Sequence, residues 1–332
     1  MPSAVSTNAS LIEAAPLVRV TVDNFNRSET DNYFATFTKQ DGFGKLQHAR
    51  ELTPIEHQAV IRLNRDTLYS FGVFDLDSAP VTVTLPDAGT RYMAVQAVDE
   101  DHYVPEVFYA PGRRTFTREG IGTRYVALLI RTFVDPASAD DMKAAHALQD
   151  AIMIEQRTRG EFVVPPLDQE SLKKMRNAIL ALAAASGGID SSRMFGRREE
   201  VDPVQHLLGT ATAWGGNPRA TALYVGGAPE ENDGKAAYLL TVKEVPVDSF
   251  WSVSVYNMGG FFEKNETNTY TVNNVTAKSN PDGSVTIHFG GDEQLPNFIH
   301  IMPGWNFVFR MYRPKQALLN GAWKLPDLER VK

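Results

Sequence analysis

The sequence predicts a multi-domain protein of mixed α and β class, in which two β-sandwich regions of jelly-roll kind are joined by a helical segment. Strand-like alternation of apolar and polar residues, interrupted by turn residues, occupies positions 58–133 and returns after position 216. Between these stretches, apolar residues recur at helical spacing. The chain has 332 residues, of which 43% are hydrophobic, so two ordinary domains with packed cores are expected.

Shifts in this pattern divide the chain into four expected parts. They are an N-terminal arm at 1–27, an N-terminal β-rich domain at 28–134, a helical segment at 135–213 and a C-terminal β-sandwich at 214–332. A short helix is expected at 30–40, capped by Thr30 or Ser28. Strands of the β-rich domain are expected at 81–85, 92–98 and 125–133, and the last of these is apolar enough to be buried on both faces.

The helical segment follows Pro136, which interrupts the strand pattern. Ser138 followed by Asp141 resembles a capping box with aspartate in place of glutamate, so a helix is expected to begin there. A second helix is expected at 168–186, and a third is expected to begin at Asp202. The C-terminal strands are expected at 237–242, 250–256, 269–275, 285–289 and 306–312.

The composition excludes several partners and chemistries. The net charge is −7 and the basic residues are scattered, whereas nucleic-acid binding requires a basic stripe that displaces counterions. The absence of cysteine excludes disulfides, thiolate metal sites and cysteine nucleophiles. No apolar run is long enough to span a bilayer. The N-terminus lacks a secretory signal, so the chain is expected to be cytoplasmic, or periplasmic if a signal peptide was removed.

Familiar catalytic motifs are missing from the sequence, which contains no G-x-S-x-G, H-E-x-x-H or P-loop string. The seven histidines include no close pair at metal-ligand spacing, so no metal site is predicted and the cofactor is unknown. Asp99, Asp101 and Glu106 form the densest carboxylate cluster. We interpret it as a solvated acidic loop, because it lacks the glycine that a calcium-binding loop requires.

Three strings in the sequence are distinctive. The first reads N-R-D-T-L-Y-S at 64–70 and leads to an R-Y pair at 91–92, and the second reads F-W-S-V-S-V-Y at 250–256. A W-G-G-N-P string at 214–218 lies between them. With the ending at 309–326, these strings resemble the bacterial family that pairs domain of unknown function 1254 with domain of unknown function 1214. The resemblance implies β-sandwich domains with a helical insert and implies no particular reaction.

Polar residues of these strings provide candidate catalytic groups. Asp66 is the expected general acid or base. Arg65 and Arg310 are expected to clamp an anion or a developing oxyanion. Tyr69 or Tyr256 is the expected proton donor. The alternative is structural, with Arg65 and Asp66 forming a buried ion pair and Tyr69 hydrogen-bonded in the core.

Trp251 and Tyr312 are candidate ligand-binding residues. Aromatic rings on the late strands offer stacking surfaces for a sugar or a lipid. Asn265, which accompanies the second string, is assigned to the same group. Core packing is the alternative explanation for the aromatic residues.

Three functions are consistent with these patterns. The first is an enzyme that acts on a small polar or anionic molecule at the domain junction. The second is a non-catalytic β-sandwich protein that binds a carbohydrate or a lipid. The third is a structural protein in which a homo-oligomer buries the helical segment. A small-molecule ligand is the expected partner in the first two cases, and a homo-oligomer is the expected assembly.

Overall fold

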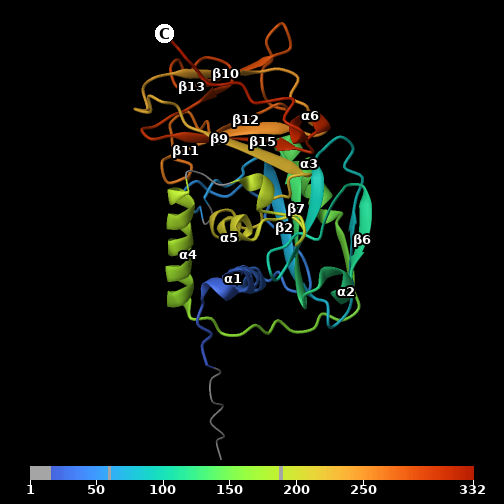
Figure 1. Ribbon diagram of the computed structural model, residues 1–332. Coiled ribbons are helices and arrows are strands. Elements are labelled where there is room, and N and C mark those ends of the chain that lie inside the picture. The colour runs from blue at the N-terminus through green and yellow to red at the C-terminus, as the bar shows by residue number, and fades with distance from the viewer. Residues whose placement is uncertain (1–15, 59–60, 187–189) are drawn as a thin grey trace, which may run out of the picture.

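The computed structural model describes residues 16–58, 61–186 and 190–332 (Figure 1). The helices are α1 (Phe25–Lys39), α2 (Arg118–Ile121), α3 (Ala139–Asp150), α4 (Gln169–Ala185), α5 (Pro203–Thr212) and α6 (Gln316–Leu319). The strands of the N-terminal half are β1 (Gln47–His48), β2 (Thr67–Asp75), β3 (Val81–Leu85), β4 (Met93–Asp99), β5 (Glu106–Tyr109), β6 (Gly112–Phe116), β7 (Tyr125–Phe133) and β8 (Met153–Gln156). Those of the C-terminal half are β9 (Ala222–Gly227), β10 (Tyr238–Val242), β11 (Trp251–Tyr256), β12 (Thr271–Asn273), β13 (Val285–Phe289), β14 (Phe298–Ile299), β15 (Asn306–Tyr312) and β16 (Glu329–Arg330).

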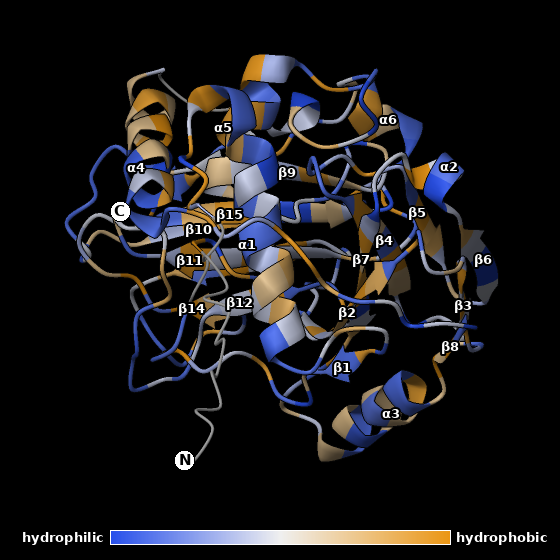
Figure 2. Ribbon diagram, turned by 90° about the horizontal axis from the view of Figure 1, so that it is seen from below, coloured by the Kyte–Doolittle hydropathy of each residue, from blue (hydrophilic) through white to orange (hydrophobic). Residues whose placement is uncertain are grey.

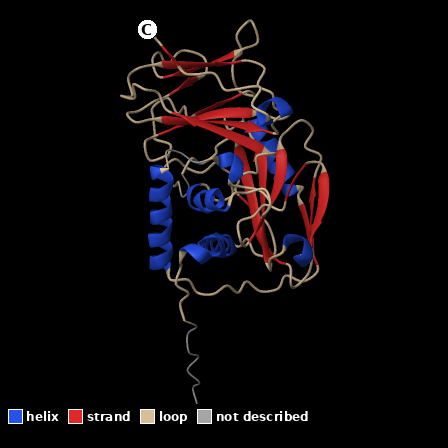
Figure 3. Cartoon of the chain, viewed as in Figure 1, coloured by secondary structure: helices blue, strands red, loops and turns tan. Residues whose placement is uncertain are grey.

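Two antiparallel sheets form the N-terminal region (Figure 3). The larger sheet has the strand order β1-β2-β7-β4-β5, and the smaller sheet has the order β6-β3-β8. β7 pairs with β2 and β4, and every one of its residues is buried, as its apolar sequence predicts. Phe74, Val95 and Leu128 of the larger sheet pack with Val83 of the smaller one. This packing makes the N-terminal region a sandwich.

Helices lie along the other face of the larger sheet, and Figure 2 shows α1 beside the strands β2 and β7. In Figure 1, α1 and α5 lie between α4 and the strands β2 and β7. Phe34 of α1 packs with Val73 and Ala127 of the sheet, and Ile179 of α4 packs with Leu208 of α5. None of the helices in the described part of the chain is long and apolar enough to cross a membrane.

Some element boundaries differ from the sequence expectations. α1 begins at Phe25, so the expected caps Thr30 and Ser28 lie buried inside the helix. A short 3-10 turn leads into it, closed by a 2.7 Å hydrogen bond from the Thr21 backbone N–H to the Asn24 side chain. β8 was not expected; it lies within the helical segment yet pairs with β3. The expected strand at 269–275 reduces to β12, and residues 1–15 of the expected arm lie outside the described residues.

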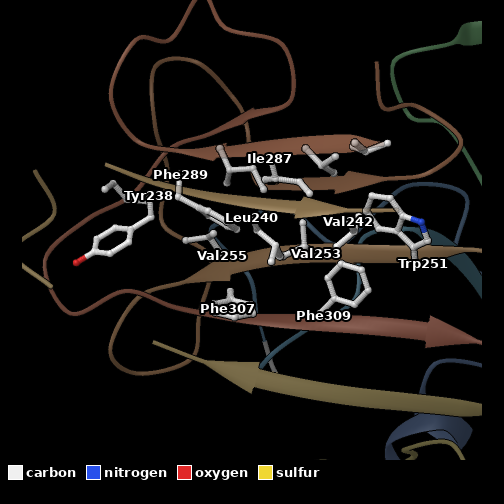
Figure 4. Packing of buried hydrophobic residues seen from close by; sticks show 14 of the residues in the cluster. Tyr238, Leu240, Val242, Trp251, Val253, Val255, Ile287, Phe289, Phe307 and Phe309 are labelled. Atoms are coloured by element: carbon white, nitrogen blue, oxygen red, sulfur yellow. The ribbon is translucent and has the colours of Figure 1, made fainter. Parts of the chain in front are cut away.

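The C-terminal region is a sandwich of two four-stranded sheets. Their strand orders are β14-β13-β10-β16 and β12-β11-β15-β9. Figure 4 shows Leu240 and Ile287 of the first sheet facing Val253 and Phe309 of the second. The mixed α and β class, with two sandwich regions and intervening helices, is therefore confirmed. Jelly-roll connectivity stays a prediction.

Candidate functional site

The second C-terminal sheet has one face in the sandwich core and the other against the large N-terminal sheet. Side chains alternate along a strand, so the outer face receives Arg310 of β15 beside its pairing partners Ser252 of β11 and Tyr224 of β9. On the N-terminal sheet, Tyr69 of β2 pairs with Arg131 of β7. One aromatic cluster contains residues of both sheets, so the two faces are in contact. We define the junction cluster as Asp66, Tyr69, Tyr92, Arg131, Tyr224, Tyr256, Arg310 and Tyr312.

Arg310 is the best-satisfied member of the junction cluster. Its side chain is only 3% exposed. It donates to Ser254 Oγ at 3.0 Å, to the backbone carbonyl of Arg62 at 2.8 Å and to the hydroxyl of Tyr256. Tyr256 in turn donates to the carbonyl of Leu63 at 2.8 Å, and burial raises its pKa against the opposing effect of Arg310. These bonds fix Arg310 and Tyr256 against the loop that precedes β2.

Asp66 is buried beside this group, with 1% of its surface exposed. One carboxylate oxygen accepts from Asn273 Nδ2 at 3.3 Å. The other has no standard hydrogen bond to the described residues, although the hydroxyls of Ser252 and Thr271 are close enough to favour the ionised form. Burial raises the pKa of Asp66, and Ser252 and Arg310 oppose this shift. Asp66 can therefore hold or release a proton inside the junction.

Arg131 lies on the opposite sheet and is 6% exposed. It donates to Gln96 Oε1 at 2.5 Å, to Asn217 Oδ1 at 3.3 Å and to the carbonyl of Gly215 at 2.7 Å. These bonds use three of its five N–H groups. The guanidinium also lies over the ring of Tyr69, with 5.5 Å between the guanidinium carbon and the ring centroid. None of the carboxylates in the described residues is within salt-bridge distance of Arg131.

Four tyrosines surround Arg131, and their hydroxyl groups have no hydrogen-bond acceptor among the described residues. They are Tyr69, Tyr92, Tyr224 and Tyr312. The hydroxyls of Tyr224 and Tyr312 receive hydrogen bonds, from Asn217 Nδ2 at 2.7 Å and from Asn64 Nδ2 at 2.9 Å. The buried hydroxyl of Tyr92 has no partner among the described residues. Tyr69 is half-buried, and its hydroxyl makes no hydrogen bond within the described ranges. The four O–H groups therefore donate to none of the described residues, and they lie close to a cation.

The structure brings together five of the residues expected from the sequence and separates three others from them. Asp66, Tyr69, Tyr256, Arg310 and Tyr312 all belong to the junction cluster. Tyr312 does so as a polar neighbour of the arginines, and its ring stacks on Phe250 with 4.3 Å between centroids. Its placement does not match the expected wall of an open cleft.

Arg65, Trp251 and Asn265 lie elsewhere, outside the junction cluster. Arg65 is turned away from its neighbour Asp66, donates to the carbonyl of Thr53 and lies over the ring of Tyr270 at 5.5 Å. Trp251 is buried in the C-terminal core and stacks on Phe309, as Figure 4 shows, because the odd-numbered residues of β11 face inward. Asn265 shapes a turn, where its side chain accepts the backbone N–H of Thr269 at 3.1 Å.

Sequence reasoning missed Arg131 and its partners. One signal was available, because a strand predicted to be buried on both faces contained a single arginine. A buried guanidinium has to be compensated, so its position marks a polar site. Asn217 belongs to the W-G-G-N-P string, which served only as a family signature. The structure shows that this string wraps the guanidinium of Arg131 through Gly215 and Asn217.

A separate surface cleft of about 540 Å³ lies beside the acidic residues that follow β4. Its lining includes Asp99 and Asp101 together with Arg197 and Arg198, so charges of both signs share the walls. Burial raises the pKa of Asp99 to about 7, although its carboxylate accepts the backbone N–H of Tyr103 at 2.8 Å. Among the described residues, no group of three acidic or histidine side chains has a geometry that could hold a metal ion.

Comparison with known proteins identifies the chain by family. Residues 43–120 match the family described as protein of unknown function DUF1254, and residues 220–316 match the family described as protein of unknown function DUF1214. The chain belongs to the family that pairs these two domains. The DUF1254 match includes Asp66, Tyr69 and Tyr92, and the DUF1214 match includes Tyr256 and Arg310. All members of the junction cluster except Arg131 therefore lie within the two matched segments.

Two solved structures share this two-domain fold. The VPA0106 protein from Vibrio parahaemolyticus is 19% identical, with a TM-score of 0.68 over 94% of this chain and 98% of that chain. An uncharacterised protein from Burkholderia cenocepacia is 14% identical, with a TM-score of 0.52 over 93% of this chain and 87% of that chain. No curated protein matches the sequence.

Proposed function

We propose that the protein is an enzyme that acts on a small anionic molecule at the junction between its two domains. Arg131 and Arg310 hold the negative charge, Tyr69 and its neighbouring tyrosines donate hydrogen bonds to it, and Asp66 transfers a proton. The fold alone specifies no reaction, so these roles are inferred from the side chains of the junction cluster. None of the roles requires a metal or a cofactor.

The observation that carries the proposal is the excess of donors over acceptors in the junction cluster. The cluster contains two buried guanidinium groups and one buried carboxylate, and no salt bridge joins that carboxylate to either of them within the described residues. Transfer of a charged group from water into a protein interior costs several kcal/mol unless opposite charge and hydrogen bonds compensate. An anionic ligand supplies both kinds of compensation.

The proton-transfer role rests on the environment of Asp66. A carboxyl group with a raised pKa exchanges a proton closer to neutral pH than a solvated one does, which is the property that general acids and bases require. Arg310 and the hydroxyl of Tyr256 lie on the same side of the junction, where they would stabilise negative charge that develops on a reacting oxygen. The cluster thus contains a proton carrier beside an oxyanion-stabilising pair.

The two alternative functions receive less support from the described residues. A sugar- or lipid-binding cleft would need accessible aromatic rings, whereas Trp251 and Trp305 are buried and stacked on core phenylalanines. An interaction role would need a broad apolar face on the helical segment. The large exposed apolar residues of this segment lie on different elements and loops, and scattered residues of this kind are ordinary for a protein surface; they are Met153, Val163, Leu182 and Val204.

The test is a thermal-stability screen against organic acids, sugar phosphates, sugars and fatty acids. A ligand at 100 times its dissociation constant adds about 2.7 kcal/mol to the free energy of unfolding, which is readily measured. Anions are expected to stabilise the wild type, and Tyr69→Phe is expected to weaken this response without lowering basal stability. Arg65→Ala is the matched control, since Arg65 lies outside the junction and should retain the response.

Turnover is then measured with the stabilising compounds by NMR. Asp66→Asn is expected to retain binding and to lose conversion of the compound. If no anion stabilises the protein, the proposed function is wrong. If an anion binds but is not converted by the wild type, the catalytic part of the proposal fails and a binding protein remains.

A further inference from the structure

The two buried arginines of the junction differ in their electrostatic surroundings. Asp66 is the one carboxylate among the groups that act on Arg310, so the charge of Arg310 has a nearby counterpart. Arg131 has no such counterpart, because the titratable groups that act on it most strongly are Tyr69, Tyr224 and Tyr92. A single positive charge is therefore left uncompensated, and it lies on the N-terminal sheet.

The hydrogen bonds of Arg131 agree with this charge count. All three of its acceptors are neutral, namely the amide oxygens of Gln96 and Asn217 and the carbonyl of Gly215. Hydrogen bonds from a guanidinium to neutral oxygens are weaker than those to a carboxylate. Two N–H groups of Arg131 remain beyond these three bonds, and the guanidinium lies over the ring of Tyr69.

We infer that the ligand of the junction is a small monoanion of the carboxylate class, anchored by Arg131. The inference rests on the proposed function and adds the charge of the ligand and the residue that selects it. One carboxylate oxygen accepts from the free N–H groups of Arg131, and the second oxygen accepts from the hydroxyls of Tyr69 and Tyr224. Both tyrosines are half-buried, whereas Arg131 itself is 6% exposed.

Charge balance argues against a dianion. A ligand with two negative charges would place the second charge toward the Asp66 side of the junction, where Arg310 is already partly compensated. Like charges in a buried site repel strongly because the effective dielectric constant is low. A monoanion instead brings the cluster, with Asp66 ionised, to a net charge of zero.

The chain offers an isosteric substitution that tests this directly. Asn217 contributes its oxygen to Arg131 and its Nδ2 to the hydroxyl of Tyr224, whose own proton goes to no described residue. In Asn217→Asp, a carboxylate accepts from Arg131 and from the reversed hydroxyl of Tyr224 with the same geometry. The variant therefore supplies the missing charge from within the protein and should remain folded.

The experiment compares acetate and glycolate with malonate, succinate and uncharged acetamide, by calorimetric titration of the full chain at neutral pH and constant ionic strength. The monoanions are expected to bind most tightly, and acetamide is not expected to bind. Arg131→Met should weaken acetate binding about 10- to 100-fold, the effect of losing charge-assisted hydrogen bonds. Asn217→Asp should lose acetate binding, and Asn320→Asp, an added charge on an exposed turn, should keep it.

The outcomes separate this inference from the proposed function. If malonate and succinate bind more tightly than acetate and glycolate, the junction binds anions but the monoanion assignment is wrong. If Asn217→Asp binds acetate as the wild type does, Arg131 is not the anchor, whether or not Arg131→Met folds. If none of these carboxylates binds while another anion of the thermal screen still stabilises the protein, this inference fails and the proposed function stands; if no anion does either, both fail.

Discussion

Replacing Asp31 by asparagine should stabilise the protein, and the gain should grow with pH. Asp31 lies on α1, is 5% exposed and has one carboxylate oxygen without a hydrogen-bond partner among the described residues. Burial raises its pKa from 3.8 to about 7, with a further contribution from the nearby carboxylate of Glu100 and an opposing one from Arg27. Each pKa unit corresponds to 1.36 kcal/mol, so ionised Asp31 costs the folded state roughly 4 kcal/mol.

The sign of the effect follows from proton binding. The folded state binds this proton more tightly than the unfolded state, so the contribution to stability is complete below the unfolded pKa of 3.8 and is lost as the pH rises through about 7. Asparagine carries no charge and removes this pH dependence. Asp31→Asn should therefore exceed the wild type in the free energy of unfolding, by an increment that rises from pH 5 to pH 8.

The assay is chemical denaturation of both proteins at pH 5, 6, 7 and 8. Asp140→Asn is the matched control, because the Asp140 side chain is 95% exposed and its loss should change stability little at any pH. A difference between Asp31→Asn and the wild type that does not change with pH would refute the reasoning. A variant that is less stable than the wild type at pH 8 would refute it as well.

Substitutions at Asp66, Trp251 and Arg65 test three other parts of the structure. Asp66→Asn should also stabilise the protein at pH 8, because burial raises the pKa of Asp66 and the charged form therefore costs stability as the pH rises; denaturation at pH 5 and pH 8 measures whether the gain grows. Trp251→Ala should lower the free energy of unfolding by about 3–5 kcal/mol and leave the affinity for acetate unchanged, since Trp251 lies in the core; an altered affinity in calorimetric titration would contradict this placement. Arg65→Ala should cost about 1 kcal/mol, from the loss of contacts with Tyr270 and Thr53, and chemical denaturation against the wild type tests this figure.

The fold was largely predictable because its signals are local. Alternating residues at 81–85 and 250–256 predicted strands, and the caps Ser138 and Asp168 marked the starts of α3 and α4. β8 escaped prediction because its four residues lie between helices and acquire strand character by pairing with β3. The start of α1 was placed too late, since the turn at Thr21 that precedes it is a local structure without a strong sequence signature.

The candidate site was less predictable because it depends on which strand faces which. Asp66 and Arg310 come from positions far apart in the chain, and the sequence linked them only through the family strings. Arg65 was expected beside Asp66, yet its side chain points toward Tyr270 instead. The role of Arg131 was not foreseen, because the importance of a buried arginine depends on its acceptors. Two of its three acceptors lie on a loop more than eighty residues away in sequence.

The same chain shows how it compensates a buried charge when packing alone requires it. Glu29 of α1 is 1% exposed and is paired with Arg176 of α4, which donates to both carboxylate oxygens, one of them at 2.6 Å. That arrangement neutralises the charge of Glu29 with a bidentate ion pair between two helices. Arg131 is buried to a similar degree and receives only neutral oxygens. A guanidinium with a purely structural role at this position could be paired with one carboxylate. Aspartate in place of Asn217 would supply that carboxylate, because the two side chains differ in a single heavy atom. The proposed ligand would supply the negative charge that Arg131 lacks, beside four hydroxyls that are free to donate to it.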